Sequence, residues 1–115
     1  MAGAAQLFIE DFVGGFFAVR ERVLTLTTTA QEVLKNDPER VGWLIVVTGT
    51  TTAQFAFGAA PTAAASILVG GSGGTFSANV RDDFTMPTHA LNGNVAAGTT
   101  TLFIVEIVRV SKPAE

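Results

Sequence analysis

The side chains that could do chemistry are few in this sequence, and their spacing fits no known site. His89 is the only histidine and cysteine is absent, so a zinc site would need several carboxylates, and the acidic residues are scattered. Asp82 and Asp83 could give oxygen ligands to calcium, but no regularly spaced ligands follow them. We therefore expect no metal site, and we interpret His89 as a loop or surface residue and the aspartates as part of a charged turn.

Phosphate binding and nucleophilic catalysis are also poorly supported. The glycine-rich stretch 70–74 resembles a phosphate loop only in composition, because no Lys-Ser/Thr pair follows and no helix is predicted to begin there. Serine and threonine are abundant, but we predict no nucleophile elbow, and the single histidine has no evident acid to orient it. The sequence therefore predicts a protein that is not an enzyme and has no catalytic or cofactor-binding residues.

The composition indicates association with other protein. The chain has 115 residues, of which 48% are hydrophobic and only 15% are charged, against a usual charged share of about 25%. Such a chain has difficulty remaining a soluble monomer, so we predict a homo-oligomer, a larger assembly, or both. The net charge of −3 and the scattered basic residues argue against nucleic acid. No apolar run reaches the roughly 18 residues of a membrane-spanning helix, so no membrane partner is expected.

The elements that must position these residues are predicted to be strands. Residues 40–48 are apolar on both alternating faces, with Trp43, Ile45 and Val47 on one and Leu44 and Val46 on the other, so we predict a central strand covered on both sides. Further strands are predicted over residues 16–27, 52–58, 66–69, 75–80 and 100–110. Residues 30–34 are predicted to be one helical turn or a loop, residues 84–91 an edge strand or irregular, and residues 92–93 a turn.

About seven or eight short strands, with turn signals every 8–12 residues, predict an all-β fold: an antiparallel β-sandwich or jelly roll. We divide the chain into an apolar N-terminal arm (1–15), a sandwich domain (16–111) and a tail (112–115). Residues 14 and 15 are both glycine and would cost about 2 kcal/mol inside a helix. We therefore prefer an extended arm, although its apolar spacing also fits a helix. The arm could cap its own sandwich or pack on a neighbouring subunit.

The predicted subunit contacts are the apolar residues of the arm and of the start of the first strand: Leu7, Phe8, Ile9, Phe12, Phe16 and Phe17. Phe55 and Phe57 are candidates for the core or for a second patch. No charged residue occurs between Arg40 and Arg81, although sheet edges are usually guarded by charges, so a neighbour is expected to cover these edges. Glu106 shares an apolar face and is predicted to form a structural ion pair with Arg40 or Arg22.

One resemblance covers about residues 20–110. It rests on Val23-Leu24-Thr25-Leu26, residues 30–34, Asn36-Asp37-Pro38, residues 40–46 with a Thr/Gly hairpin after them, and Ile67-Leu68-Val69-Gly70-Gly71. This layout resembles the small β-sandwich virion proteins of tailed bacteriophages, which decorate or cement capsids or form spikes and fibres, often as trimers. The resemblance implies a structural virion protein, assembled in the host cytoplasm, with a trimeric state and a larger capsid protein as partner.

A second functional class stays open at this point. A sandwich of this kind could instead bind a carbohydrate or a receptor through loops, for which residues 58–65, 70–74 and 92–99 are the candidates. No functional residue is assigned to such a site from the sequence.

Overall fold

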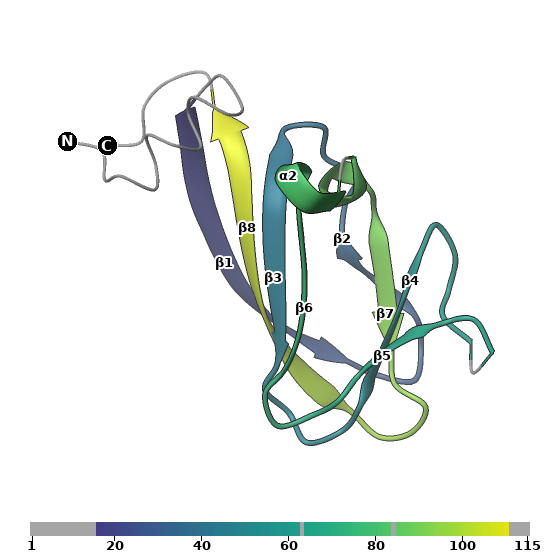
Figure 1. Cartoon of the computed structure of the whole chain (residues 1–115). Helices are drawn as coiled ribbons and strands as arrows, with labels where there is room; N and C mark the ends of the chain where they lie inside the picture. The colour runs from purple at the N-terminus through teal and green to yellow at the C-terminus, as the bar shows by residue number, and fades with distance from the viewer. Residues whose placement is uncertain (1–15, 63, 84, 111–115) are drawn as a thin grey trace.

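The computed structural model describes residues 16–62, 64–83 and 85–110 (Figure 1). In this part of the chain eight strands form two four-stranded sheets, and every strand pair is antiparallel. The strands are β1 (Phe16–Leu26), β2 (Gln31–Leu34), β3 (Arg40–Val47), β4 (Ala53–Phe57), β5 (Ile67–Val69), β6 (Gly74–Asn79), β7 (Leu91–Asn94) and β8 (Thr100–Val110). Two short helical turns, α2 (Val80–Asp83) and η1 (Met86–Thr88), precede β7. The predicted all-β class is confirmed.

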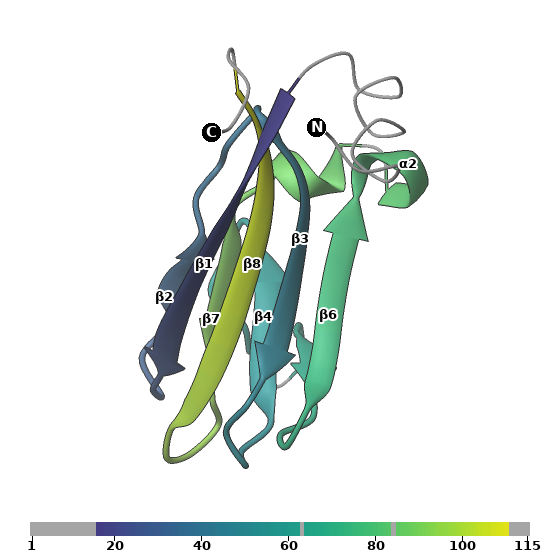
Figure 2. The same cartoon turned by 90° about the vertical axis from the view of Figure 1, so that its left-hand side faces the viewer.

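The two sheets stack face to face as a β-sandwich. Sheet A has the strand order β1-β8-β3-β6, and sheet B has the order β2-β7-β4-β5. Figure 2 looks onto sheet A, with β2, β7 and β4 of sheet B behind it. The chain crosses between the sheets repeatedly, so that β1 and β2 are the edge strands on one side of the sandwich and β6 and β5 are those on the other.

The core lies between the sheets and is built from the inward half of each alternating strand. Trp43, Ile45 and Val47 of β3 face inward, and none is more than 3% exposed. The ring of Phe76 in β6 meets that of Trp43 edge to face, with centroids 4.8 Å apart, an arrangement that adds to the stabilisation from area burial. Phe55 of β4 is fully buried, so it belongs to the core, and the half-buried Phe57 packs against it.

Two predictions of local structure were wrong. Residues 30–34, expected to be a helical turn or a loop, include strand β2, which pairs with β7. Residues 92 and 93, expected to be a turn, lie inside β7, a central strand of sheet B. A Cβ atom at Gly93 would stand 2.8 Å from Cγ2 of Val33 and 3.3 Å from Cδ1 of Phe55. The glycine therefore serves close packing in the core, not a turn conformation.

Strand β3 is central, as predicted, but in the single chain it is covered on one face only. Its inward residues are buried, whereas Leu44 on the opposite face is 38% exposed and Val46 is half-buried. Among the described residues, sheet B covers one face of sheet A and no second layer covers the other. The expectation of cover on both sides is therefore not met within one molecule.

Candidate functional site

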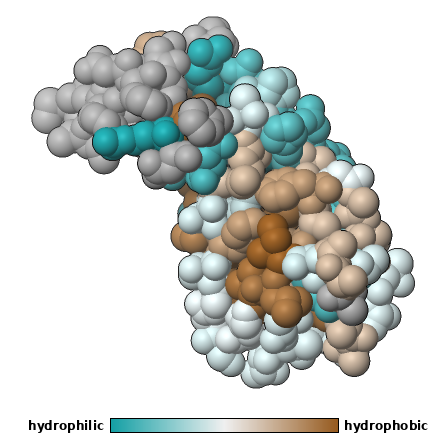
Figure 3. Space-filling model, turned by 45° about the vertical axis from the view of Figure 1, so that its right-hand side comes forward, coloured by the Kyte–Doolittle hydropathy of each residue, from teal (hydrophilic) through white to brown (hydrophobic). Residues whose placement is uncertain are grey.

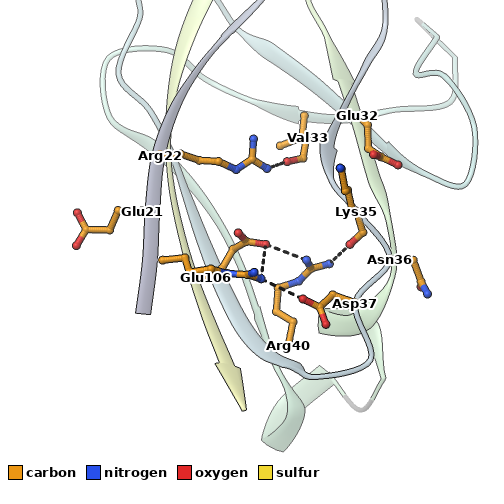
Figure 4. A pocket seen from close by; sticks show the side chains of 10 residues that line it. Glu21, Arg22, Glu32, Val33, Lys35, Asn36, Asp37, Arg40 and Glu106 are labelled. Carbon is orange, nitrogen blue, oxygen red and sulfur yellow. Dashed lines mark hydrogen bonds and ion pairs between the residues drawn. The ribbon is translucent and has the colours of Figure 1, made fainter. Parts of the chain in front are cut away.

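A groove of about 740 Å³ lies between the edge strands β1 and β2. Charged side chains of both signs line it, and Figure 4 shows Arg40 and Glu106 turned toward each other there. Arg40 is 1% exposed and Glu106 is 7% exposed. A buried charge needs a partner and hydrogen bonds, so the contacts of these two side chains decide what the groove can do.

Arg40 is satisfied by four partners. Its Nη1 donates to Oε1 of Glu106 at 2.9 Å, which confirms the predicted ion pair. Its other nitrogens donate to the backbone carbonyls of Pro87 at 2.7 Å, Lys35 at 2.7 Å and His89 at 3.1 Å. One guanidinium thus joins β3 and β8 of sheet A to the chain segments that flank β2 and β7 of sheet B.

A β-bulge puts Arg40 in this position. Opposite β8 the register shifts between Arg40 and Gly42, so β3 holds one extra residue, Val41. Without that residue Arg40 would share the outward face of Leu44, because side chains alternate along a strand. No pattern in the sequence indicates this bulge.

Arginine side chains from sheet A also occupy the outer edge of β2. A guanidinium nitrogen of Arg22 donates to the carbonyl of Val33, just as Arg40 donates to the carbonyl of Lys35. Val33 lies where the register between β2 and β7 shifts. Arg22, the alternative partner predicted for Glu106, therefore binds backbone instead.

Arg20 and Asp37 complete the network at the mouth of the groove. Nη2 of Arg20 lies 3.0 Å from Oδ2 of Asp37 and 3.8 Å from Oε1 of Glu106. Partial burial alone would raise the pKa of Asp37. Hydrogen bonds from the Glu39 backbone N–H and from Arg20, together with the positive charges of Arg20 and Arg40, lower the pKa by more than burial raises it. Its pKa therefore lies below the ordinary value. Because Arg20, Arg22 and Arg40 all have protein partners, we interpret the groove as a structural joint between the sheets.

The residues examined for chemistry do not gather at one place. His89 is exposed and its Nε2 lies 3.5 Å from the Thr85 hydroxyl, beside a small pocket of about 320 Å³. The Asp83 carboxylate, at the end of α2, accepts the backbone N–H of Asn79. Within the described residues no three His, Cys, Asp or Glu side chains come close enough to hold a metal ion. The same part of the chain has no helix of the length and apolarity needed to cross a membrane.

Residues 70–74, with Ser72 at their centre, match the Gly-X-Ser-X-Gly pattern of a nucleophile elbow. Ser72 has a positive φ of 58°, which such an elbow also shows. The pattern requires a strand, a sharp turn and then a helix, whereas here β6 begins at Gly74. The Ser72 backbone N–H donates to the carbonyl of Gly49. We therefore interpret this loop as a hairpin connection held against the turn after β3.

The second candidate surface is the outer face of sheet A, the side away from sheet B. Its centre is apolar, with Val19 61% exposed, Val23 68% exposed and Leu44 38% exposed. The strand registers add four half-buried side chains to this face: Val46, Phe103, Val105 and Ile107. Hydroxyl and amide side chains border this centre at one end (Thr25 and Thr101) and along β6 (Thr75, Ser77 and Asn79), and Glu21 lies on the same face between Val19 and Val23. An apolar centre inside a polar rim is the usual composition of a protein interface.

Charges are distributed unequally over the two sides of the sandwich. Edge strands β1 and β2 carry charged side chains, but β5 and β6 lie within the charge-free stretch 41–80. Figure 3 shows hydrophobic surface on the side that carries β5, where Ile67 is 40% exposed and Leu68 is 64% exposed. The edges left without charge are thus brought to one side of the molecule.

The predicted subunit contacts are only partly visible. Leu7, Phe8, Ile9 and Phe12 lie outside the described residues, as do the boundaries proposed for the arm and the tail. Phe16 is 38% exposed and Phe17 is 7% exposed. Of the loops predicted for ligand binding, 92–99 is partly wrong because Asn92 to Asn94 belong to β7. The outer face of sheet A is not predicted from the sequence, because both alternating faces of β3 are apolar and therefore indicate cover on both sides.

Comparison with known proteins supports the fold. The sequence matches no protein-family model and no curated protein. Among solved structures, the chain is similar to a protein of the Bacillus endospore appendages, which form a family of disulfide-linked pili. The TM-score is 0.51 at 16% sequence identity, and the match covers 84% of this chain and 91% of that chain. It is also similar to the coat protein of Tobacco streak virus, with a TM-score of 0.46 at 8% identity, over 86% of this chain and 90% of that chain.

Proposed function

We propose that this protein is a non-enzymatic structural protein whose copies assemble through the outer face of sheet A. The observation that carries this proposal is the apolar centre of that face, which sheet B does not cover. More specifically, we propose that the protein is a virion component, such as a capsid decoration or cement protein of a phage. The trimeric state and the capsid partner implied by the phage resemblance are part of this more specific proposal.

The size of the face is sufficient for a specific interface. At the usual rise and spacing of strands, the four strands of sheet A cover about 600 Å². Covering this area with a partner would bury about 1,200 Å² in total, the lower end of the range for stable complexes. Buried apolar surface contributes about 25 cal/mol per Å² before association costs are subtracted.

One of the similar proteins of known structure comes from an assembly, the Bacillus endospore appendages, which agrees with the proposal. Those appendages are described as disulfide-linked pili, whereas the 115 residues of this chain contain no cysteine. Copies of this chain would therefore associate without disulfides, by apolar contact alone or together with hydrogen bonds.

The experiment is light scattering coupled to size-exclusion chromatography, over a dilution series. We expect a mass above the 11.9 kDa of one chain that falls as the protein is diluted. The double variant Val23→Thr/Val105→Thr keeps shape and strand preference but adds hydroxyls to the face. It should lose about 1 kcal/mol per site, or about 30-fold in the association constant.

Leu68→Thr is the matched control, since Leu68 is as exposed as Val23 but lies on β5 of the other sheet. It should leave the association constant within about threefold. A wild-type protein that stays monomeric at every concentration would contradict the proposal. So would a Val23→Thr/Val105→Thr variant that assembles as well as the wild type. A specific glycan bound by the monomer would favour the carbohydrate-binding alternative.

A further inference from the structure

We propose that the outer face of sheet A is the docking site for residues 1–15 of a second copy of this chain, so that copies are joined by their N-terminal segments. This inference rests on the proposed self-assembly and adds the identity of the segment that covers the face. It is supported by the chemistry of the two surfaces, the reach of the segment, and the point at which the segment joins the sheet.

The chemistry of the segment matches that of the face. Residues 7–13 include five large apolar side chains on either side of the acidic pair Glu10 and Asp11: Leu7, Phe8, Ile9, Phe12 and Val13. Along the outward positions of β1, β8 and β3, charged side chains occur only at Glu21 and Arg109 among the described residues. Two apolar surfaces of this kind gain free energy by covering each other, whereas each is costly to leave in water.

The reach of the segment matches the length of the face. Fifteen extended residues span about 50 Å, whereas β1 and β8, the longest strands of the face, are about 36 Å long at the usual rise per residue. A segment that leaves one molecule can therefore lie along the whole face of the next one and still bridge a gap between them.

The point of attachment favours a second copy over the same chain. The segment joins the structure at Phe16, the first residue of edge strand β1. To lie on its own face, the chain would have to reverse direction and rise by the roughly 10 Å that separates packed layers. Three Cα–Cα steps, from Val13 to Phe16, span at most about 11 Å. A Val13 side chain on its own face would need this connection fully stretched, whereas a segment that leads away to a neighbour needs neither the stretch nor the reversal.

Cross-linking of separate single-cysteine variants tests this inference directly, because the chain has no cysteine of its own. One protein carries Phe8→Cys and the other carries Val105→Cys with a small mass tag. The two are mixed at low concentration, then concentrated and treated with a short bis-maleimide. We expect a cross-linked dimer of one tagged and one untagged chain, at least about tenfold more abundant than the product of Phe8→Cys with Leu68→Cys.

Three results would overturn the inference. The first is no enrichment over the Leu68→Cys control. The second is a Phe8→Cys/Val105→Cys double variant that cross-links only within one chain. The third is a Val105→Cys protein that cross-links to itself more efficiently than to Phe8→Cys, which would mean that two faces meet directly.

The same samples separate this inference from the proposed function. If light scattering shows an assembly but the cross-link is missing, self-assembly stands and the N-terminal segment is not the occupant. If the mass is that of one chain throughout, both proposals fail. Val23→Cys serves as a second position on the face, so that a local effect of one substitution cannot produce the result.

Discussion

Replacing Arg40 by methionine should strongly destabilise the sandwich. The change removes the 2.9 Å bond to Glu106 and three hydrogen bonds to backbone carbonyls, while the methionine keeps most of the apolar stem. Glu106 would stay buried, with Arg20 at 3.8 Å as its remaining cation, and the Arg20 side chain is 52% exposed. Breaking a buried pair costs about 3–5 kcal/mol because the other charge is left uncompensated, and a half-exposed arginine offsets little of this.

The assay is urea unfolding followed by the fluorescence of Trp43, the single tryptophan, which is 3% exposed. The double variant Arg40→Met/Glu106→Leu removes both charges and should recover much of the loss, since apolar replacement of a whole buried pair is often neutral. Arg109→Met is the control, because Arg109 and Glu39 form an exposed pair at 3.1 Å whose loss should cost under about 1 kcal/mol. A loss below about 1 kcal/mol for Arg40→Met would refute the assignment of Arg40 as the joint between the sheets.

Two other predictions follow from single positions. Gly93→Ala should lower the free energy of unfolding by about 1–3 kcal/mol, because the new Cβ would stand 2.8 Å from Val33. Gly70→Ala is the control and should change this free energy little, because no atom lies within 4 Å of a Cβ there. Equal losses for the two variants in urea unfolding would contradict this account. The lowered pKa of Asp37 means that its stabilisation is present above the unfolded value of about 3.9 and is lost as the pH falls through the folded value. Asp37→Asn should therefore flatten the dependence of the urea midpoint on pH below about pH 4, and an unchanged acid limb would show that the Asp37 contacts contribute nothing.

The long strands could be predicted from the sequence because their patterns are complete. β1, β3 and β8 have eight to eleven residues each, long enough for alternation and β-branched side chains to dominate the pattern. β2 and β7 have four residues each, too few for a period to emerge. In β7 the local signal even favours a turn, and only the proximity of Val33 and Phe55 shows why a glycine is needed there.

The sequence predicts that Glu106 needs a cationic partner, but it does not determine which arginine supplies it. A carboxylate among apolar inward positions requires a cation, which could be read from the alternation of β8. The choice between Arg40 and Arg22 depends on the bulge at Val41 and on the carbonyl of Val33, which accepts a hydrogen bond from Arg22. Both arise from strand pairing within a sheet, of β3 with β8 and of β2 with β7, which neighbouring residues in the sequence do not determine.

The contacts that Arg22 and Arg40 make at β2 have a consequence for how copies could be added to one another. A strand from another molecule can extend a sheet only where backbone carbonyls and amides are still available at its margin. Those two guanidinium groups already occupy the carbonyls of Val33 and Lys35, and the opposite margin of sheet B is β5, three residues long. Both margins of sheet B are thereby poor templates for strand addition, so a polymer that grows in this way would propagate more readily through sheet A.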